Sequence, residues 1–325
     1  MAATLVGCGT PDIDTDAKEI KFGEATTRAE VDSADDILEF KVFAEMNLGA
    51  DGTAEASQWI PILENERVYR TSTSSPFIYD HTRYWVENRK FNFFAVYPYD
   101  TAVTVDEGAA SFSVAETPSE TDWLIARNAT DTSATPIPED VQLQFKHILT
   151  SVGLRIWRDN GKHQNDQMRI KKVTLANMRK AGTVTSGMRD ESLVWSYTAD
   201  KLTMEHSNTN LSDTDNIDAA NVNPDGTLEM SSTGYNPFDQ LMLLPQAVES
   251  GTVTLRIEYE LKRQNAADWE SAELEAPLPA ITWVAGNKYT YNVVLSSVTD
   301  ITIYYIQTKV DQWGTPQVGG TVIIK

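Results

Sequence analysis

The sequence predicts an all-β protein, and three features of the chain indicate this fold class. Short apolar runs recur along most of the chain, where apolar residues alternate with polar ones or form brief blocks. Gly, Asn, Asp, Pro and Ser residues bound these runs, as turns between strands require. Apolar residues at the helical spacing i, i+3 and i+4 are scarce. Many short strands separated by frequent turns are typical of β-sandwiches and not of a parallel α/β sheet.

The expected strands follow one another from residue 38 onward. In the first half of the chain they span 38–46, 59–70, 90–99, 110–116 and 141–148. In the second half they span 151–159, 170–178, 241–246, 252–262, 288–298 and 301–313. The stretch ADDILEFKVFAE at 34–45 also fits a helix, but its β-branched and aromatic residues favour a strand.

The segment WVAGNKYTYNVVL shows how the local pattern orients residues within a strand. Gly286 and Asn287 form a turn dipeptide between two expected strands. Tyr289, Tyr291 and Val293 then alternate with other residues, so they share one face of the second strand.

The length of the chain predicts two domains, because 325 residues exceed the size at which a single core usually stops growing. The segment at 126–140 is polar, rich in Thr and Ser and contains two prolines, so we interpret it as a linker or a domain-crossing loop. We therefore divide the chain into an N-terminal segment 1–28, an N-terminal sandwich 29–137 and a C-terminal sandwich 138–325. A second polar stretch at 204–239 is interpreted as an insertion or surface loop.

The charge of the chain argues against nucleic acid as a partner. Asp and Glu number 47 against 27 Lys and Arg, which gives a formal net charge of -20. A polyanion would be repelled, and no basic stripe offsets this charge. No run of 18 or more apolar residues occurs, so no helix is expected to span a membrane.

Sequence motifs for catalysis or metal binding are missing. The four histidines lack the HExxH spacing of metal ligands and are expected in loops or on strand surfaces. No G-x-S-x-G, P-loop or G-x-G-x-x-G motif occurs. The acidic stretch at 212–226 fails the EF-hand pattern because Ile217 occupies the third ligand position. We therefore expect no catalytic residue, no metal and no cofactor.

Cys8 is the only cysteine, so the chain cannot form an internal disulfide or a cysteine cluster for a metal. The sequence LVGC that ends at Cys8 fits the lipobox of bacterial lipoproteins, in which the cysteine is lipidated and becomes the new N-terminus. Seven residues precede Cys8 and none is Lys or Arg, so the charged region of a signal peptide is missing. We interpret Cys8 as a lipidation site behind a signal remnant, with a chance occurrence of LVGC as the alternative.

A series of short motifs runs through the chain in a fixed order. They are EIKFGEATTRAEV, FKVFAEM, RYWVENRKFNFFAVYPY, TDWLIAR, LQFKHILTSVGLRI, KKVTLANM, LLPQ, WVAGNKYTYNVVL and VDQWG. In content and order this series resembles the fimbrillin-like proteins of Bacteroidales, which are the subunits of type V pili. The resemblance covers the chain from about residue 18 to its end.

The resemblance implies a lipoprotein precursor with two transthyretin-like β-sandwich domains in tandem. It also implies that an arginine-specific protease cuts near the N-terminus and removes the first strand. Carried over to this sequence, the cut falls between Arg28 and Ala29, and the removed strand contains Ile20 and Phe22 on one face. The alternative is that Arg28 is an ordinary loop arginine.

The end of the chain, PQVGGTVIIK, also alternates between apolar and other residues. Val318, Gly320, Val322 and Ile324 fall on one face of the expected strand. A free apolar terminal strand is a hazard unless it pairs. Donation into the groove of a neighbouring subunit would pair it by β-augmentation. The alternative is that this strand completes the sheet of its own domain.

The expected function is that of a non-enzymatic structural subunit of a fimbrium on the cell outer membrane, held there only through a lipid on Cys8. The acidic residues at 12–16 resemble signals that send lipoproteins of this phylum to the outer face. Expected partners are other pilus subunits, the arginine-specific protease, and host glycans or proteins. The alternatives are a non-polymerising surface adhesin, a pilus tip protein, a carbohydrate-binding lipoprotein, or an enzyme such as a glycan hydrolase.

Overall fold

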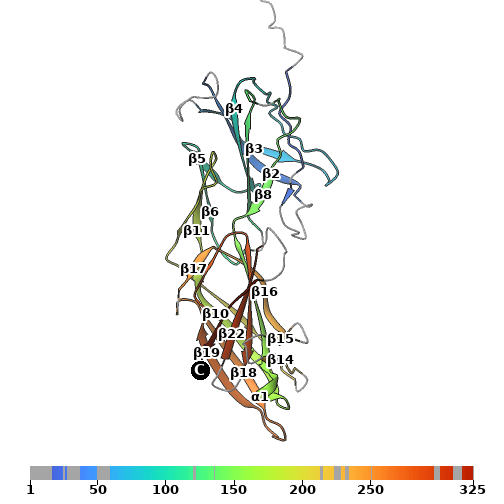
Figure 1. The fold of residues 1–325 in the computed structure, drawn as a ribbon, viewed down its shortest axis with the longest axis vertical. Coiled ribbons are helices and arrows are strands. Elements are labelled where there is room, and N and C mark those ends of the chain that lie inside the picture. The colour runs from blue at the N-terminus through green and yellow to red at the C-terminus, as the bar shows by residue number, and fades with distance from the viewer. Residues whose placement is uncertain are drawn as a thin grey trace, which may run out of the picture.

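The structure is a computed structural model, and it confirms the all-β fold class. It describes residues 17–24, 26–27, 37–49, 59–119, 122–134, 136–212, 215–222, 228–230, 234–249, 251–295, 301–309 and 317–324. In these residues the regular structure is β-strand except for one four-residue helix, α1 (Asn160–His163). Figure 1 shows two groups of strands that follow one another along the long axis of the molecule. No helix in the described ranges is long and apolar enough to cross a membrane.

The first group of strands contains a six-stranded sheet. Its order is β1 (Thr26–Thr27), β8 (Gln144–His147), β7 (Leu124–Asp131), β4 (Lys90–Tyr97), β2 (Glu39–Asn47) and β3 (Trp59–Tyr69). The inner strands β2 and β4 are buried along nearly their whole length. Burial of consecutive residues means that both faces of this sheet are covered.

A separate hydrophobic core covers each face of the six-stranded sheet. On one face, Phe40 and Phe93 pack against Ile20, Phe22 and Trp85. The other face packs against a four-stranded sheet in the order β12 (Leu193–Tyr197), β11 (Gly182–Gly187), β6 (Ala109–Val114) and β5 (Val103–Asp106).

The second group of strands forms a sandwich around the largest core. One sheet has the order β13 (Lys201–Ser207), β10 (Gln167–Arg179), β18 (Thr254–Lys262) and β19 (Glu270–Pro277). The other has the order β15 (Leu228–Met230), β14 (Ala219–Val222), β9 (Thr150–Asp159), β21 (Asn287–Leu295), β22 (Ile301–Lys309) and β23 (Gln317–Ile324), with β16 (Tyr235–Leu243) also paired to β9. A short pair of strands, β17 (Gln246–Val248) and β20 (Ile281–Trp283), completes this group.

The core between these two sheets contains the residues of β21 that the sequence predicts to share one face. Tyr289, Tyr291 and Val293 are all buried in it, on the one face that the sequence predicted. Trp283 donates a hydrogen bond from Nε1 to the Tyr291 hydroxyl at 2.9 Å, so both polar groups are paired inside the core. Gly286 has φ of 71°, a value that favours glycine in the turn before β21.

Two segments differ from the predicted organisation around residue 137. The first part of the predicted linker is wrong, because residues 126–131 belong to β7 inside the six-stranded sheet. Strands β8 and β11 follow residue 137 in the sequence, yet β8 pairs with β7 and β11 pairs with β6. The division of the chain into two domains at residue 137 stays a prediction.

Candidate functional site: the first strand and the terminal hairpin

The N-terminal segment 17–24 lies between two neighbouring stretches of chain and bonds to both. On one side, Ile20 N donates to the Arg83 carbonyl at 2.8 Å, and Trp85 N donates to the Lys18 carbonyl at 2.9 Å. On the other side, Val141 N donates to the Lys21 carbonyl at 2.7 Å. The segment is therefore held as a strand in a slot with two walls.

The side chains of this segment alternate between the core and solvent. Ile20 is 0% exposed and Phe22 is 4% exposed, whereas Lys21 between them is exposed. The Phe22 ring makes edge-to-face contacts with Phe40 and Phe93, with ring centroids 6.2 Å and 6.1 Å apart. Such aromatic pairs add to the gain from apolar burial. The first strand is thus an integral part of the core that it covers.

Tyr79 ties the first strand to the wall of the slot. Its hydroxyl donates to the Ile20 carbonyl at 2.7 Å, and its ring lies 5.5 Å from that of Phe22. Burial raises the pKa of Tyr79, because it disfavours the phenolate. The hydroxyl therefore keeps its proton, and with it the hydrogen bond to Ile20, to a higher pH than an exposed tyrosine would.

The slot continues beside Phe22 as an open pocket of about 330 Å³. Phe22, Gly23, Arg70 and Phe77 are among the residues that line it. The Arg70 guanidinium lies 4.5 Å from the centre of the Phe77 ring and donates to the Ile37 carbonyl at 2.9 Å. A Cβ on Gly23 would lie 2.4 Å from Gln142 Nε2, so a larger residue here would require the end of this flexible side chain to move.

Other residues predicted for this end of the chain lie outside the described residues. These are Cys8, Arg28 and Ala29. Just before Arg28, the two residues of β1 pair in parallel with β8, Thr26 opposite Gln144 and Thr27 opposite Phe145. The chain that leads to the predicted cleavage site therefore runs along the edge of the six-stranded sheet.

The C-terminal strand β23 forms a hairpin with β22 at the edge of its sheet. Strand β22 pairs along its whole length with β21, and β23 pairs with β22 alone. The register shifts between Tyr304 and Tyr305, where the partner on β23 steps from Thr321 to Gly319. The shift leaves Gly320 without a partner, so a β-bulge interrupts the alternation of Val318 with Val322 and Ile324 in this pairing. The predicted donation of this strand stays a proposal.

One histidine differs from its sequence-based expectation. His147 was expected in a loop or on a strand surface, yet it is only 8% exposed. Its Nδ1 makes a short hydrogen bond with Asp122 Oδ2, because a buried imidazole requires a polar partner. In the described ranges, no group of three or more His, Cys, Asp or Glu side chains could hold a metal ion.

A polar surface pocket is the feature that sequence reasoning missed. It lies between the end of β13 and the start of β16, within the stretch that the sequence analysis interpreted as an insertion or loop. Asn208 and Tyr235, which line it, are 27 positions apart and bond to each other. The clustering of Asn and Asp at 207–218 was the available signal, but only the folded chain brings Tyr235 to it.

This protein is an all-β protein built from stacked sheets. Segments near both ends of the described chain are paired with neighbouring strands. The chain belongs to the fimbrillin-like family, whose model matches residues 27–313. This match confirms the resemblance inferred from the motif series. Membership of this family implies a place in a cell-surface fimbrium and suggests other pilus subunits as partners.

The chain is similar to solved structures from Bacteroides species. A fimbrial protein from Bacteroides vulgatus aligns with a TM-score of 0.66 and 18% sequence identity, over 90% of this chain and 99% of that one. A proposed cell adhesion protein from Bacteroides uniformis aligns with a TM-score of 0.49 and 15% identity, over 90% of this chain and 97% of that one. No curated protein matches the chain significantly.

Proposed function

We propose that this protein is a pilus subunit that assembles by strand exchange after a cut between Arg28 and Ala29. The observation that carries the proposal is the burial of Ile20 and Phe22 in a slot with two walls. An arginine-specific protease would free the first strand. The empty slot would then expose an apolar groove that only another strand can fill.

The groove left by the first strand would bind an incoming strand strongly. Loss of the first strand leaves main-chain groups such as Val141 N and the Arg83 carbonyl without their present partners. It also exposes the apolar surface that Ile20 and Phe22 cover. Because unpaired polar groups and exposed apolar surface are both costly, an incoming strand would bind tightly.

The C-terminal strand β23 is the proposed donor. It pairs on one side only, and its apolar residues Val318, Val322 and Ile324 alternate without interruption if no bulge forms at Gly320. A groove shaped for the alternating pair Ile20 and Phe22 requires such a regular strand. We further propose that a lipid on Cys8 anchors the uncut precursor in the outer membrane at the cell surface.

The test is treatment of the purified protein with an arginine-specific protease. We expect Ala29 as the new N-terminus and ladders of polymers that resist SDS. Arg28→Lys should block both, because a protease specific for arginine does not cut after lysine. A protein that is cut at Arg28 and stays monomeric would contradict assembly and favour a non-polymerising adhesin.

The donor is tested separately by deletion of residues 318–325. The deleted protein should be cut normally and accept a strand from intact subunits, but it should not donate one. Mixed with intact cut protein, it should therefore shorten the ladders in proportion to its share of the mixture. Ladders of unchanged length would exclude β23 as the donor.

A further inference from the structure

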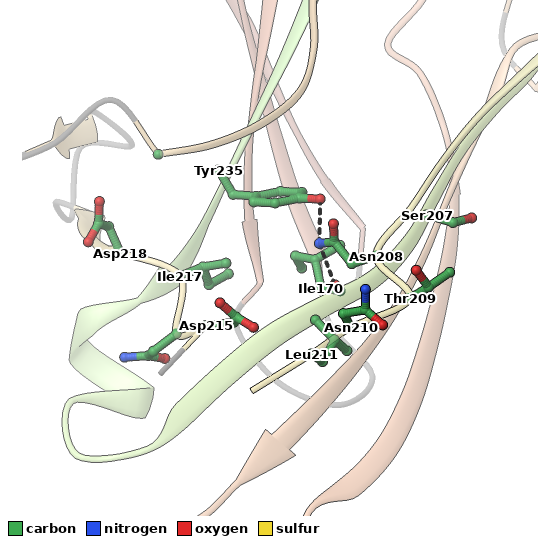
Figure 2. Close-up of a pocket in the computed structure, with 12 residues that line it drawn as sticks. Ile170, Ser207, Asn208, Thr209, Asn210, Leu211, Asp215, Ile217, Asp218 and Tyr235 are labelled. Carbon is green, nitrogen blue, oxygen red and sulfur yellow. Dashed lines mark hydrogen bonds between the residues drawn. The ribbon is translucent and has the colours of Figure 1, made fainter. Parts of the chain in front are cut away.

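A polar pocket opens on the surface of the second group of strands. Its volume is about 640 Å³, within the range of pockets that hold small ligands. Figure 2 shows Tyr235 on one side of the pocket and Asn210, Leu211 and Asp215 on the other. Ile170 and Ile217 lie between these two sides.

Hydrogen bonds to β10 fix both ends of the loop that lines the pocket. At one end, Asn208 N donates to the Lys171 carbonyl at 2.8 Å. At the other end, Ile217 N donates to the Met168 carbonyl at 2.8 Å, and Met168 N donates to Asn216 Oδ1 at 2.7 Å. These bonds hold Asn208, Asn216 and Ile217 in place against β10.

The aromatic wall is fixed as well. Asn208 Nδ2 donates to the Tyr235 hydroxyl at 2.8 Å and to the Ile170 carbonyl at 3.0 Å (Figure 2). Gly234, which precedes this tyrosine, has φ of 69°, and a Cβ there would lie 2.4 Å from the Trp157 ring. Only glycine therefore allows the chain to cross Trp157 closely and to present Tyr235 to the pocket.

Several polar groups in the pocket have unused hydrogen-bonding capacity. Among the described residues, the side chains of Thr209, Asn210 and Asp218 have no hydrogen-bond or ion-pair partner. The Tyr235 hydroxyl accepts a hydrogen bond from Asn208, so its own hydrogen can donate to a ligand. The pocket thus offers a hydroxyl, an amide and a carboxylate beside the phenol of Tyr235, which the hydrogen bond from Asn208 holds in place.

The charge and the apolar surface of the pocket limit the kinds of ligand that fit it. The lining contains the carboxylates of Asp215 and Asp218 and no Lys or Arg, so an anion would be repelled. The Tyr235 ring, Ile170 and Ile217 provide apolar surface between the polar groups. A ligand that fits carries several hydroxyl groups, no negative charge and one apolar face. We propose that this pocket binds a neutral sugar residue, with Asn210, Asp218 and Tyr235 as its hydrogen-bonding contacts.

The proposal does not rest on polymerisation, so the intact, uncut protein is the sample for its test. Saturation-transfer difference NMR would be recorded with galactose, mannose, fucose and N-acetylglucosamine, and with N-acetylneuraminic acid as the anionic comparison. We expect transfer to at least one neutral sugar and none to the anionic one. Absence of transfer to all four neutral sugars would overturn the proposal, and equal transfer to the anionic sugar would overturn its charge argument.

Variants then locate the binding. Asn210→Ala and Asp218→Asn remove groups that are exposed and have no partner in the described residues, so both proteins should fold normally. Each should weaken binding of the responding sugar about tenfold, because Asn210→Ala removes a hydrogen-bonding amide and Asp218→Asn replaces a charged acceptor with a weaker neutral one. Asp200→Asn makes the same charge change at the opposite end of β13 and should leave binding unchanged. Equal affinity in all three variants would show that the sugar binds elsewhere.

Discussion

At the scale of single residues, the burial of Phe22 makes a direct prediction about stability. Its ring packs against Phe40, Tyr79 and Phe93 and is 4% exposed. Phe22→Ala should lower the free energy of unfolding of the uncut protein by about 3–5 kcal/mol, because it leaves a cavity in the core. Urea unfolding measures this change.

The neighbouring Lys21 provides a matched control for that substitution. Its side chain is exposed, so Lys21→Ala should change the free energy of unfolding by less than about 0.5 kcal/mol. Equal stability of the Phe22→Ala and Lys21→Ala proteins would mean that the first strand contributes little to the core in solution.

A second prediction at this scale concerns alkaline pH. Burial raises the pKa of Tyr259 from 10.0 to about 12, and the residue is 0% exposed. The unfolded chain loses this proton near pH 10 while the folded chain keeps it, so the stabilisation is complete below pH 10 and is lost as the pH rises to 12. The loss amounts to roughly 2–3 kcal/mol for a shift of two pKa units.

Tyr259→Phe removes this titration without removing the ring. The variant should therefore lose about 2–3 kcal/mol less stability than the natural sequence between pH 10 and 12. Urea midpoints at the two pH values measure the difference, and the other tyrosines cancel because both proteins contain them. Parallel pH curves for the two proteins would contradict the raised pKa of Tyr259.

At the scale of elements, the hairpin of β11 and β12 is attached to the six-stranded sheet by a partly buried ion pair. Arg189, in the turn of the hairpin, donates from Nε to Glu45 Oε1 at 2.5 Å and from Nη2 to Oε2 at 2.8 Å. Glu45 is 7% exposed and also accepts a hydrogen bond from Asn92. This geometry raises the pKa of Arg189, chiefly through the hydrogen bond to Glu45.

Arg189→Met should destabilise the protein by about 3 kcal/mol, because it leaves the Glu45 carboxylate buried without its charge partner. The double variant Glu45→Met with Arg189→Met should recover most of this loss, since no uncompensated charge remains. Chemical unfolding of the single and double variants measures both effects. A double variant that is no more stable than Arg189→Met would show that the packing of Arg189 matters more than its charge.

The strands that the sequence predicted are those with many apolar residues. Strands β2, β4, β9 and β21 lie within or near their predicted ranges, because burial on both faces requires an apolar run. The hairpin of β11 and β12 was missed, because β11 consists mainly of Gly, Thr and Ser and β12 has only five residues.

The candidate sites also differ in whether the local sequence could predict them. The alternation of Ile20, Lys21 and Phe22 could be read from the sequence because it is local. The burial of His147 and the meeting of Asn208 with Tyr235 could not, because each depends on contacts between distant segments. Local patterns therefore identified the strand slot, whereas the surface pocket required the structure.

At the scale of the whole molecule, the two groups of strands depend on each other unequally. Among the side chains that the structure describes, the core of the second group consists of residues between 152 and 295. The core between the six-stranded sheet and β6 includes Val184 and Met188, which the second half of the chain supplies. We therefore expect the fragment 149–325 to fold alone and the fragment 1–148 to require it.

Fragment expression tests this dependence. The fragment 1–148 alone should aggregate, because Phe94 and Phe112 lose part of their cover and β6 loses its partner β11. Expressed together, the two fragments should form a one-to-one complex, as size-exclusion chromatography with light scattering would show. A soluble, monomeric 1–148 fragment with well-dispersed NMR signals would contradict the expectation.

The separation of the slot from the terminal hairpin has a consequence for the shape of any polymer. The slot belongs to the first group of strands, whereas β23 lies in the seven-stranded sheet of the second (Figure 1). A contact between two different surfaces that is made once leaves one groove and one strand of the pair unused, so the same contact can repeat from one subunit to the next. Under the proposed exchange, every filament would have a polarity, with an empty groove at one end and an unused strand at the other.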